Sequence, residues 1–213
     1  MAEVEIRIQQ LAKRFQKEWI FGGIDQTLLS GQKYAVKGPN GSGKSTFLQL
    51  IAGLQLPTRG QIHYRIADQE IKAERVYKYL SLCAPYLELI EEFSLEEIIR
   101  FHLHFKPFRP QVSQEAFIQR MGLEKARKKP LQFFSSGMKQ RIKLGLALYS
   151  DTPILLLDEP TSNLDQNGID WYREEVLQTS PQRLLIICSN QSYEYDFCEQ
   201  VIDIQSFKPK RKS

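Results

Sequence analysis

Apolar and polar residues alternate over some segments of this chain and form continuous apolar runs over others. The pattern predicts strands over residues 4–9, 32–37, 61–66, 79–84, 154–157 and 184–188. The first segment, VEIRIQ, alternates as a half-buried strand does, whereas the last two segments are almost entirely apolar. Continuous apolar runs are typical of parallel strands that are buried on both faces. The sequence therefore predicts an α/β fold with a mainly parallel sheet.

Helical spacing appears in the segments between these strands. The pattern predicts helices over residues 44–53 and 165–177. Between residues 85 and 132 the spacing stays helical, with Ser94 as an expected N-cap and Glu97 as its capping-box partner. We expect residues 85–132 to form a helical subdomain inserted into a single domain that covers residues 1–213.

Composition narrows the class of protein. The chain has 213 residues, of which 42% are hydrophobic and 25% charged, as in a soluble globular protein with one sizeable core. No apolar run approaches the roughly 18 residues that a membrane helix needs. The start, MAEVEIRIQQ, is acidic and alternating where a secretory signal would be basic and then apolar. We therefore expect a cytoplasmic protein.

The number and spacing of the cysteines suggest neither a zinc site nor a disulfide framework. The three cysteines, Cys83, Cys188 and Cys198, are odd in number and lack C-x-x-C spacing, so we expect reduced thiols.

The net charge is +4, and much of it lies in the runs KARKK at 125–129 and KPKRK at 208–212. Such runs can touch anionic lipid or nucleic acid, but they are more often solvated surface. We expect no nucleic-acid partner.

A glycine-rich loop directly follows the predicted strand at 32–37. It has the pattern G-x-x-x-x-G-K-[ST], and its members are Gly38, Pro39, Asn40, Gly41, Ser42, Gly43, Lys44, Ser45 and Thr46. Glycines let successive backbone N–H groups approach an anion, and the following helix N-terminus adds positive potential. We expect Lys44 to reach the β- and γ-phosphates of a nucleotide and the Ser45 hydroxyl to bind Mg²⁺.

Two acidic residues end the apolar run at 154–157. Asp158 and Glu159 stand at the carboxyl end of a predicted buried strand, where α/β folds collect their ligands. With a phosphate-binding loop in the same chain, we expect Asp158 to hold Mg²⁺ and Glu159 to polarise the attacking water.

A serine-rich turn precedes this strand. The sequence FSSGM, residues 134–138, offers a hydroxyl, free backbone N–H groups and a helix N-terminus, which together can bind an anion. We expect Ser135 and Gly137 to contact phosphate. Taken alone, the turn fits a serine-capped helix better than an anion site, but its position before the Asp158 strand favours the anion site.

The order of these motifs resembles the ATP-binding subunits of ABC transporters over nearly the whole chain. GPNGSGKST resembles Walker A, FSSGMKQR the signature, ILLLDEPTS Walker B and SNLD the D-loop. The resemblance implies a P-loop NTPase core of ABC type with an N-terminal antiparallel β part and a helical insert. It also implies a head-to-tail pair of ATP-binding subunits, identical or homologous, and a separate transmembrane permease subunit. The chain would then lie on the cytoplasmic face of the membrane and hydrolyse ATP to ADP and phosphate.

This chain departs from the family pattern at several positions. Ser136 and Met138 replace the first Gly and the Gln of the signature. No Gln lies between residues 69 and 111, so the lid Gln is missing near Ala84 or Pro85, and no His follows His104, so the switch His is missing. Asn190 occupies the place of that His; an Asn can donate a hydrogen bond to phosphate but cannot carry a proton.

Other assignments remain open at this stage. Phe15 is the expected partner of the adenine ring, with Trp19 and Phe21 as competitors. We assign no ligand role to His102 and His104, because neighbours two residues apart lie on different faces of a helix. The missing Gln and His also permit a slow ATP-dependent clamp, and a soluble ABC ATPase not coupled to transport would share every motif.

Overall fold

The computed structural model describes residues 2–178 and 182–208, and these divide into two compact units. The first unit contains residues 2–82, 153–159 and 182–208. The second unit contains residues 83–152 and 160–178. Each unit has its own hydrophobic core.

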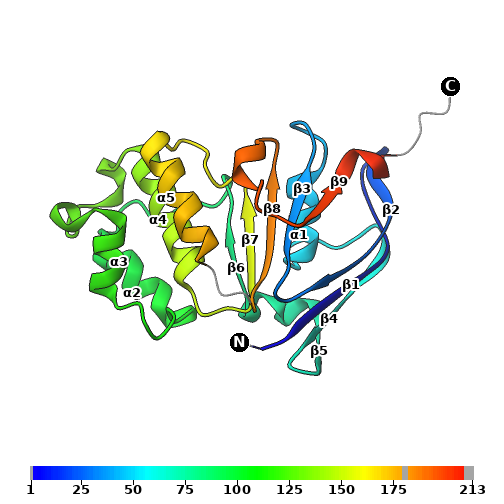
Figure 1. Cartoon of the computed structure of the whole chain (residues 1–213), viewed down its shortest axis with the longest axis horizontal. Coiled ribbons are helices and arrows are strands. Elements are labelled where there is room, and N and C mark those ends of the chain that lie inside the picture. Colours follow the sequence, from blue (N-terminus) through cyan, green and yellow to red (C-terminus); the bar gives the residue numbers. More distant parts are fainter. Residues whose placement is uncertain (1, 179–181, 209–213) are drawn as a thin grey trace. The chain divides into compact units, whose positions relative to one another are not determined.

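A five-stranded sheet has the order β6-β7-β8-β3-β9 (Figure 1). Its strands are β6 (Leu80–Cys83), β7 (Ile154–Asp158), β8 (Leu184–Ser189), β3 (Lys33–Lys37) and β9 (Gln200–Asp203). The pairs β7–β8, β8–β3 and β3–β9 are parallel. All residues of β7 and β8 are buried, as their continuous apolar sequences predict. The expected parallel sheet is confirmed.

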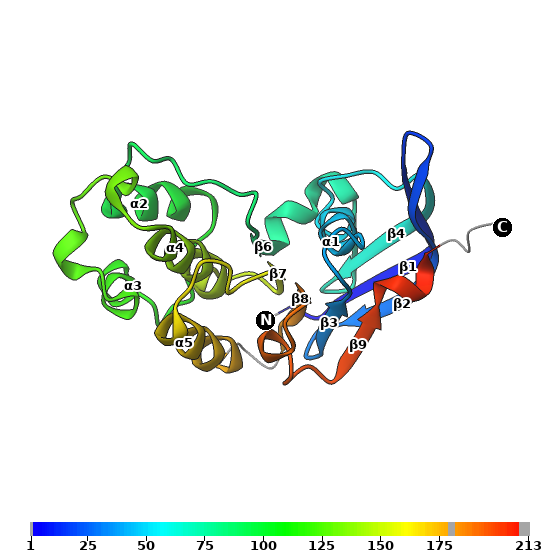
Figure 2. The same ribbon diagram turned by 90° about the horizontal axis from the view of Figure 1, so that it is seen from above.

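A four-stranded antiparallel sheet, also in the first unit, has the order β2-β1-β4-β5, and Figure 2 shows its strands β1, β2 and β4. Its strands are β1 (Val4–Phe15), β2 (Glu18–Leu29), β4 (Arg59–Ile66) and β5 (Gln69–Ile71). Val4, Ile6 and Ile8 face the core from β1, while the residues between them are more exposed. The helix α1 (Lys44–Ile51) belongs to the same core, in which Phe47 meets Phe21 of β2 edge to face.

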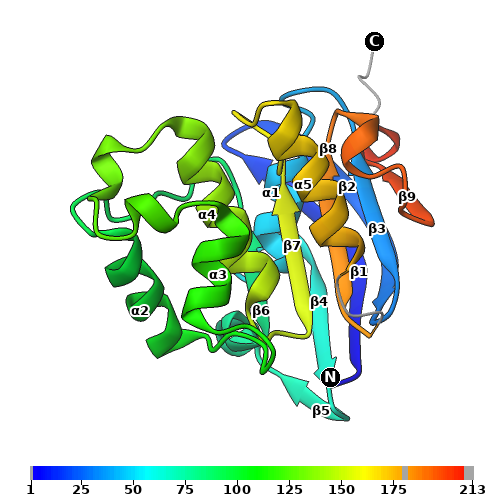
Figure 3. The ribbon, with the colours of Figure 1, turned by 60° about the vertical axis from the view of Figure 1, so that its left-hand side comes forward.

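The second unit is helical. It contains α2 (Leu95–Phe105), α3 (Gln114–Met121), α4 (Ser136–Tyr149) and α5 (Gln166–Leu177). Figure 3 shows α2, α3 and α4 grouped together, and α5 contacts α4. Apolar side chains that include Ile99, Phe117 and Ile142 form its core. Short 3₁₀ helices lie at Ala73–Tyr79, Glu124–Ala126, Leu131–Phe133, Ser192–Glu194 and Ile204–Phe207.

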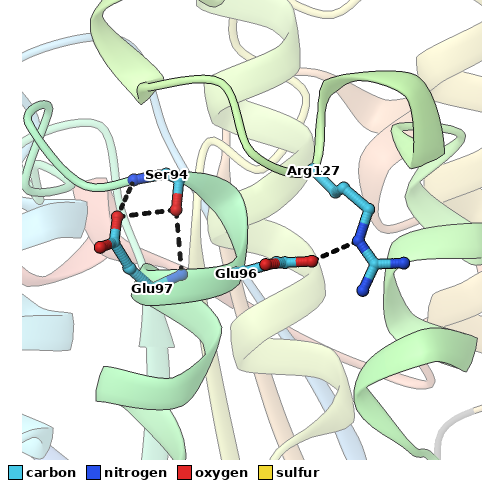
Figure 4. A network of polar contacts seen from close by, with 4 residues as sticks. All are labelled: Ser94, Glu96, Glu97 and Arg127. Atoms are coloured by element: carbon cyan, nitrogen blue, oxygen red, sulfur yellow. Dashed lines mark hydrogen bonds and ion pairs between the residues drawn. The ribbon is translucent and has the colours of Figure 1, made fainter.

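The first turn of α2 is held by a capping box (Figure 4). Ser94 Oγ accepts a hydrogen bond from the Glu97 backbone N–H, and the Glu97 carboxylate accepts one from the Ser94 N–H at 2.8 Å. The neighbouring Glu96 carboxylate forms an ion pair with Arg127. The predicted N-cap and its partner are therefore confirmed, and they fix where α2 begins.

Several features of the structure were not in the sequence prediction. The first strand continues to Phe15, and β2, β5, β9 and α3 were not expected as separate elements. The second unit contains α4 and α5 as well as the segment expected as the helical insert. The bounds of that insert, residues 85–132, therefore remain a prediction.

Cys83, Cys188 and Cys198 are free thiols. The basic side chains of the run at 125–129 are exposed, whereas most of the run at 208–212 lies outside the described residues. Within residues 2–178 and 182–208, no helix has the length and apolar character required to cross a membrane.

Candidate nucleotide site

The glycine-rich loop joins the end of β3 to the start of α1. Gly43 is the N-cap of α1, has φ 107° and makes no side-chain capping bond. A Cβ on Gly43 would lie 2.5 Å from a methyl carbon of Ile20, so the loop has room only for glycine there. The first N–H groups of α1 have no intrahelical partners, so they can bind an anion such as a phosphate.

Lys44 places its ammonium group at this loop. The residue is 4% exposed, and Nζ donates hydrogen bonds to the carbonyl oxygens of Gly38 and Pro39 at 2.9 and 3.3 Å. These are neutral acceptors, and a phosphate would be a stronger one because it is charged. The geometry therefore presents a cation at the loop where the sequence predicts phosphate binding.

Asp158 ends β7 and is almost fully buried. Within the described residues, neither carboxylate oxygen has a hydrogen-bond partner of good geometry. Burial raises the pKa of Asp158 to about 6; the nearby Ser45 hydroxyl and Lys44 partly offset this effect, whereas Glu159 and Glu194 add to it. A buried carboxylate beside a hydroxyl provides the hard oxygen ligands that Mg²⁺ prefers. The residues present therefore fit this ion.

Glu159 lies in the same pocket as the loop. The pocket is lined by Ile20, Asn40, Gly41, Ser42, Gly43, Lys44, Ser45, Thr46 and Glu159. The backbone of Glu159 has φ 44°, which is uncommon for a residue with a side chain, and its N–H donates to Cys188 O at 2.8 Å. Such strain is found most often at functional sites.

Asn190 follows β8 and contacts the loop. Its Nδ2 donates a hydrogen bond to Asn40 Oδ1 at 2.9 Å. The turn that carries it is held by Ser189, whose Oγ accepts from the Gln191 N–H at 2.8 Å. The structure thus brings Asn190 to the glycine-rich loop, although residues 40 and 190 are far apart in sequence.

The serine-rich turn begins α4 in the second unit. Ser135 is the N-cap, and its Oγ accepts from the Met138 N–H at 3.2 Å. Ser135 and Gly137 line a hollow together with Asn163 and neighbouring residues. A Cβ on Gly137 would lie 2.9 Å from Asn163 O, so the close approach of these two backbones requires glycine. Met138 packs against the helical core.

Comparison with known proteins identifies the family. The model of the ABC transporter family matches residues 21–162, which is most of the chain. This chain belongs to the ABC transporter family. The match confirms, at the level of the family, the expected ATPase and the expected function in ATP-driven transport, and it implies binding of ATP and ADP.

Relatives and solved structures agree with this assignment. The chain is 32% identical over 197 residues to the lipoprotein-releasing system ATP-binding protein LolD of Idiomarina loihiensis, covering 85% of each chain. It is 29% identical over 195 residues to the ABC transporter ATP-binding protein YybJ of Bacillus subtilis, covering 89% of this chain and 86% of the relative. The dimeric ABC transporter cassette MJ0796 matches with a TM-score of 0.80 at 20% identity, covering 97% of each chain, which confirms the fold.

The three aromatic side chains considered as adenine partners differ in how much of each ring is accessible. Phe21 is fully buried, so it has no free face for adenine, and its candidacy was wrong. Phe15 is 45% exposed, with Lys13 Nζ 5.0 Å from the ring centre. The guanidinium carbons of Arg14 and Arg59 lie 5.2 and 5.1 Å from the ring centre of Trp19. Phe15 and Trp19 therefore remain as predicted adenine partners.

Two residues at the ABC site were missed in the sequence. Ile20 lines the pocket from β2, a strand that the sequence pattern did not predict. Glu194 is 2% exposed and, as a nearby like charge, contributes to the raised pKa of Asp158. It lies in a short 3₁₀ helix after β8, where no motif distinguishes it from a surface acid.

The two histidines to which we assigned no ligand role have hydrogen-bond partners within the protein. His102 Nε2 lies 2.8 Å from Ser150 Oγ, and His104 Nδ1 lies 2.7 Å from Arg100 O. At the expected position of the lid Gln, Ala84 is buried and Pro85 exposed, and neither side chain offers a polar group.

Proposed function

We propose that this ABC subunit binds ATP on the loop at 38–46 and hydrolyses it to ADP and phosphate, with Lys44 and Glu159 as the principal catalytic residues. The observation that carries the proposal is that Glu159 lines one pocket with Lys44 and Ser45. In that pocket, Lys44 would bind the β- and γ-phosphates, and the Glu159 carboxylate would accept a proton from the attacking water.

The proposed metal ligands are Ser45 and Asp158. Their fit is supported by the two buried oxygens of Asp158 that accept no hydrogen bond of good geometry from the described residues. When bound, Mg²⁺ would neutralise phosphate charge and orient the oxygens of the γ-phosphate. Asn190, in the turn after β8, would donate a further hydrogen bond to phosphate.

A second ATP-binding subunit, identical or homologous, would complete the site. Ser135 and Gly137 offer a hydroxyl and the backbone N–H groups at the N-terminus of α4. In a head-to-tail pair, these groups would contact the γ-phosphate of the nucleotide bound to the other subunit. One of the solved structures similar to this chain is a dimeric cassette, which supports the arrangement.

ATP hydrolysis by this chain would drive transport through a separate transmembrane subunit, which the chain would contact at the cytoplasmic face of the membrane. The relative LolD is named for a lipoprotein-releasing system, and another relative, ArtM of Bacillus subtilis, for arginine transport. The second unit exposes large aromatic side chains, including Phe101 at 43% and Phe105 at 71%, which could contact such a partner. Co-purification with a membrane protein separates this function from that of a soluble ABC ATPase.

The proposed hydrolysis can be tested on the purified chain by phosphate release from ATP with Mg²⁺ and with a chelator in its place. We expect release only with Mg²⁺. Lys44→Ala should weaken ATP binding at least 10-fold, because it removes a charged donor to phosphate. Equal phosphate release by Lys44→Ala and wild type would contradict the assignment of the loop.

Hydrolysis could also be slow, in keeping with the missing lid Gln and switch His. A chain that acts as an ATP-dependent clamp would bind ATP with the same residues and release phosphate hardly faster than the Glu159→Gln variant. The retained carboxylate at 159 favours hydrolysis, because general-base assistance contributes about 10²- to 10⁴-fold.

A further inference from the structure

Gln140 is a buried amide that contacts the residue directly after Glu159 and the last residue of β6. It lies in α4, five residues after the N-cap Ser135, and is 1% exposed. Its Nε2 donates a hydrogen bond to Pro160 O at 2.8 Å and lies 3.9 Å from Cys83 Sγ. Pro160 directly follows Glu159, and Cys83 ends β6 directly before the position of the missing lid Gln.

The orientation of this amide follows from its partner. The carbonyl oxygen of Pro160 can only accept a hydrogen bond, so the NH₂ group of Gln140 must face it. Both residues are buried, and a buried carbonyl without a donor is unfavourable. The bond is therefore a constraint on the backbone at Pro160 as well as on the side chain of Gln140.

Glu159 needs support from both sides because its backbone is strained. Its φ of 44° persists only where the surroundings hold it. On the N-terminal side, the Glu159 N–H is bound to Cys188 O at 2.8 Å. On the C-terminal side, Pro160 has no N–H to donate, so its carbonyl group is the backbone group of that residue available for an anchor. Gln140 supplies that anchor.

We infer that Gln140 is a positioning residue for ATP hydrolysis, which holds Glu159 at its working position through the carbonyl group of Pro160. The helix that carries Gln140 also presents Ser135, so one rigid element connects the signature turn to the turn that follows the catalytic carboxylate. This inference rests on the proposed role of Glu159. It gives a physical reason for a polar side chain at a fully buried position in α4.

The inference predicts a loss of turnover without a loss of nucleotide binding. Gln140→Met keeps the length and volume of the side chain but removes the donor, and Gln140→Glu keeps the shape but places an acceptor against a carbonyl oxygen. We expect each variant to lower kcat for ATP about 10- to 100-fold, since a small displacement of a catalytic group has effects of this size. KM for ATP should change less than about 3-fold, because the contacts that bind ATP stay intact.

A double variant distinguishes positioning from general stability. If Gln140 acts through Glu159, Gln140→Met should lower kcat in the wild type but hardly further in the Glu159→Gln background. A purely structural role would lower kcat by the same factor in both backgrounds, and that result would overturn the inference, as would an unchanged kcat in both single variants. Circular dichroism melting identifies any variant that fails to fold, in which case Gln140→Glu replaces Gln140→Met.

The matched control is Gln119, an exposed Gln on α3 of the same unit. Gln119→Met should leave kcat and KM unchanged, because its side chain is in solvent. Absence of ATP hydrolysis by the wild type would refute the proposed function, whereas wild-type hydrolysis with an unaffected Gln140→Met variant would refute the positioning role alone.

Discussion

At the scale of single residues, the candidate nucleotide pocket combines matches to the ABC pattern with substitutions. Lys44, Ser45, Asp158 and Glu159 occupy their motif positions, and the structure places the loop, Glu159 and Asp158 within the first unit. Lys44 and Ser45 could be found from sequence because they end a glycine-rich motif, and Asp158 and Glu159 because they end an apolar run. Ile20 could not, since nothing in its neighbourhood distinguishes a pocket residue from a core residue.

Asn190 offers the most direct residue-scale prediction. Its Nδ2 already donates to Asn40 of the loop, so it is placed to donate to a phosphate instead when nucleotide is bound. We expect Asn190→Ala to lower kcat/KM for ATP roughly 10-fold, the value of one hydrogen bond to a charged group. Steady-state kinetics with the neighbouring Gln191→Ala as control would check this. Identical kcat/KM for Asn190→Ala and wild type would leave Asn190 as a turn residue only.

At the scale of elements, the sequence predicted most reliably where one kind of pattern continued without interruption. β7 and β8 could be predicted because their apolar runs are unbroken. The end of β1 could not, because its pairing with β2 shifts register between Ile8 and Leu11, and Gln10 there has φ 48°. Such a bulge moves the following side chains to the other face and ends the visible alternation. β9 has only four residues, too few for a pattern.

The helix α2 should make stability depend on pH through His102. Ser150 Oγ donates to Leu146 O at 2.6 Å and so accepts from His102 Nε2–H. Burial, with Lys106 as a lesser cause, lowers the pKa of His102 to about 4. The neutral ring therefore contributes stability that is fully present above about pH 6.5 and is lost as the pH falls toward 4.

Urea unfolding at pH 7.5 and pH 5 would measure this effect. The free energy of unfolding should fall by about 1–2 kcal/mol more in the wild type than in His102→Gln, after allowance for the partial exposure of the ring. His102→Gln removes the titrating group and retains a donor for Ser150. The same pH dependence in both proteins would show that another group controls acid stability.

At the scale of the whole molecule, the chain carries two separate features that we propose bind phosphate, each within its own unit. The loop at 38–46 belongs to the first unit and the Ser135 turn to the second. Family membership explains this division, since the two features would serve two different nucleotides in a pair of subunits. The resemblance to the family implied the pairing, but the sequence did not indicate the transported substrate, which we expect the separate membrane subunit to determine.

We expect hydrolysis to depend most on Glu159, because the chain lacks the lid Gln and the switch His. With general-base assistance removed and the phosphate contacts intact, Glu159→Gln should bind ATP normally and accumulate as an ATP-bound pair of subunits. Size-exclusion chromatography with and without ATP would report the pair, and Asp158 in this variant would still supply a metal ligand.

The decisive measurement is single-turnover hydrolysis of bound ATP by the purified wild type and by Glu159→Gln, with enzyme in excess. We predict that the wild type hydrolyses its ATP at least about 100-fold faster than the variant, the lower end of the range for general-base catalysis. Equal rates in the two proteins would contradict the assignment of Glu159 as the catalytic base.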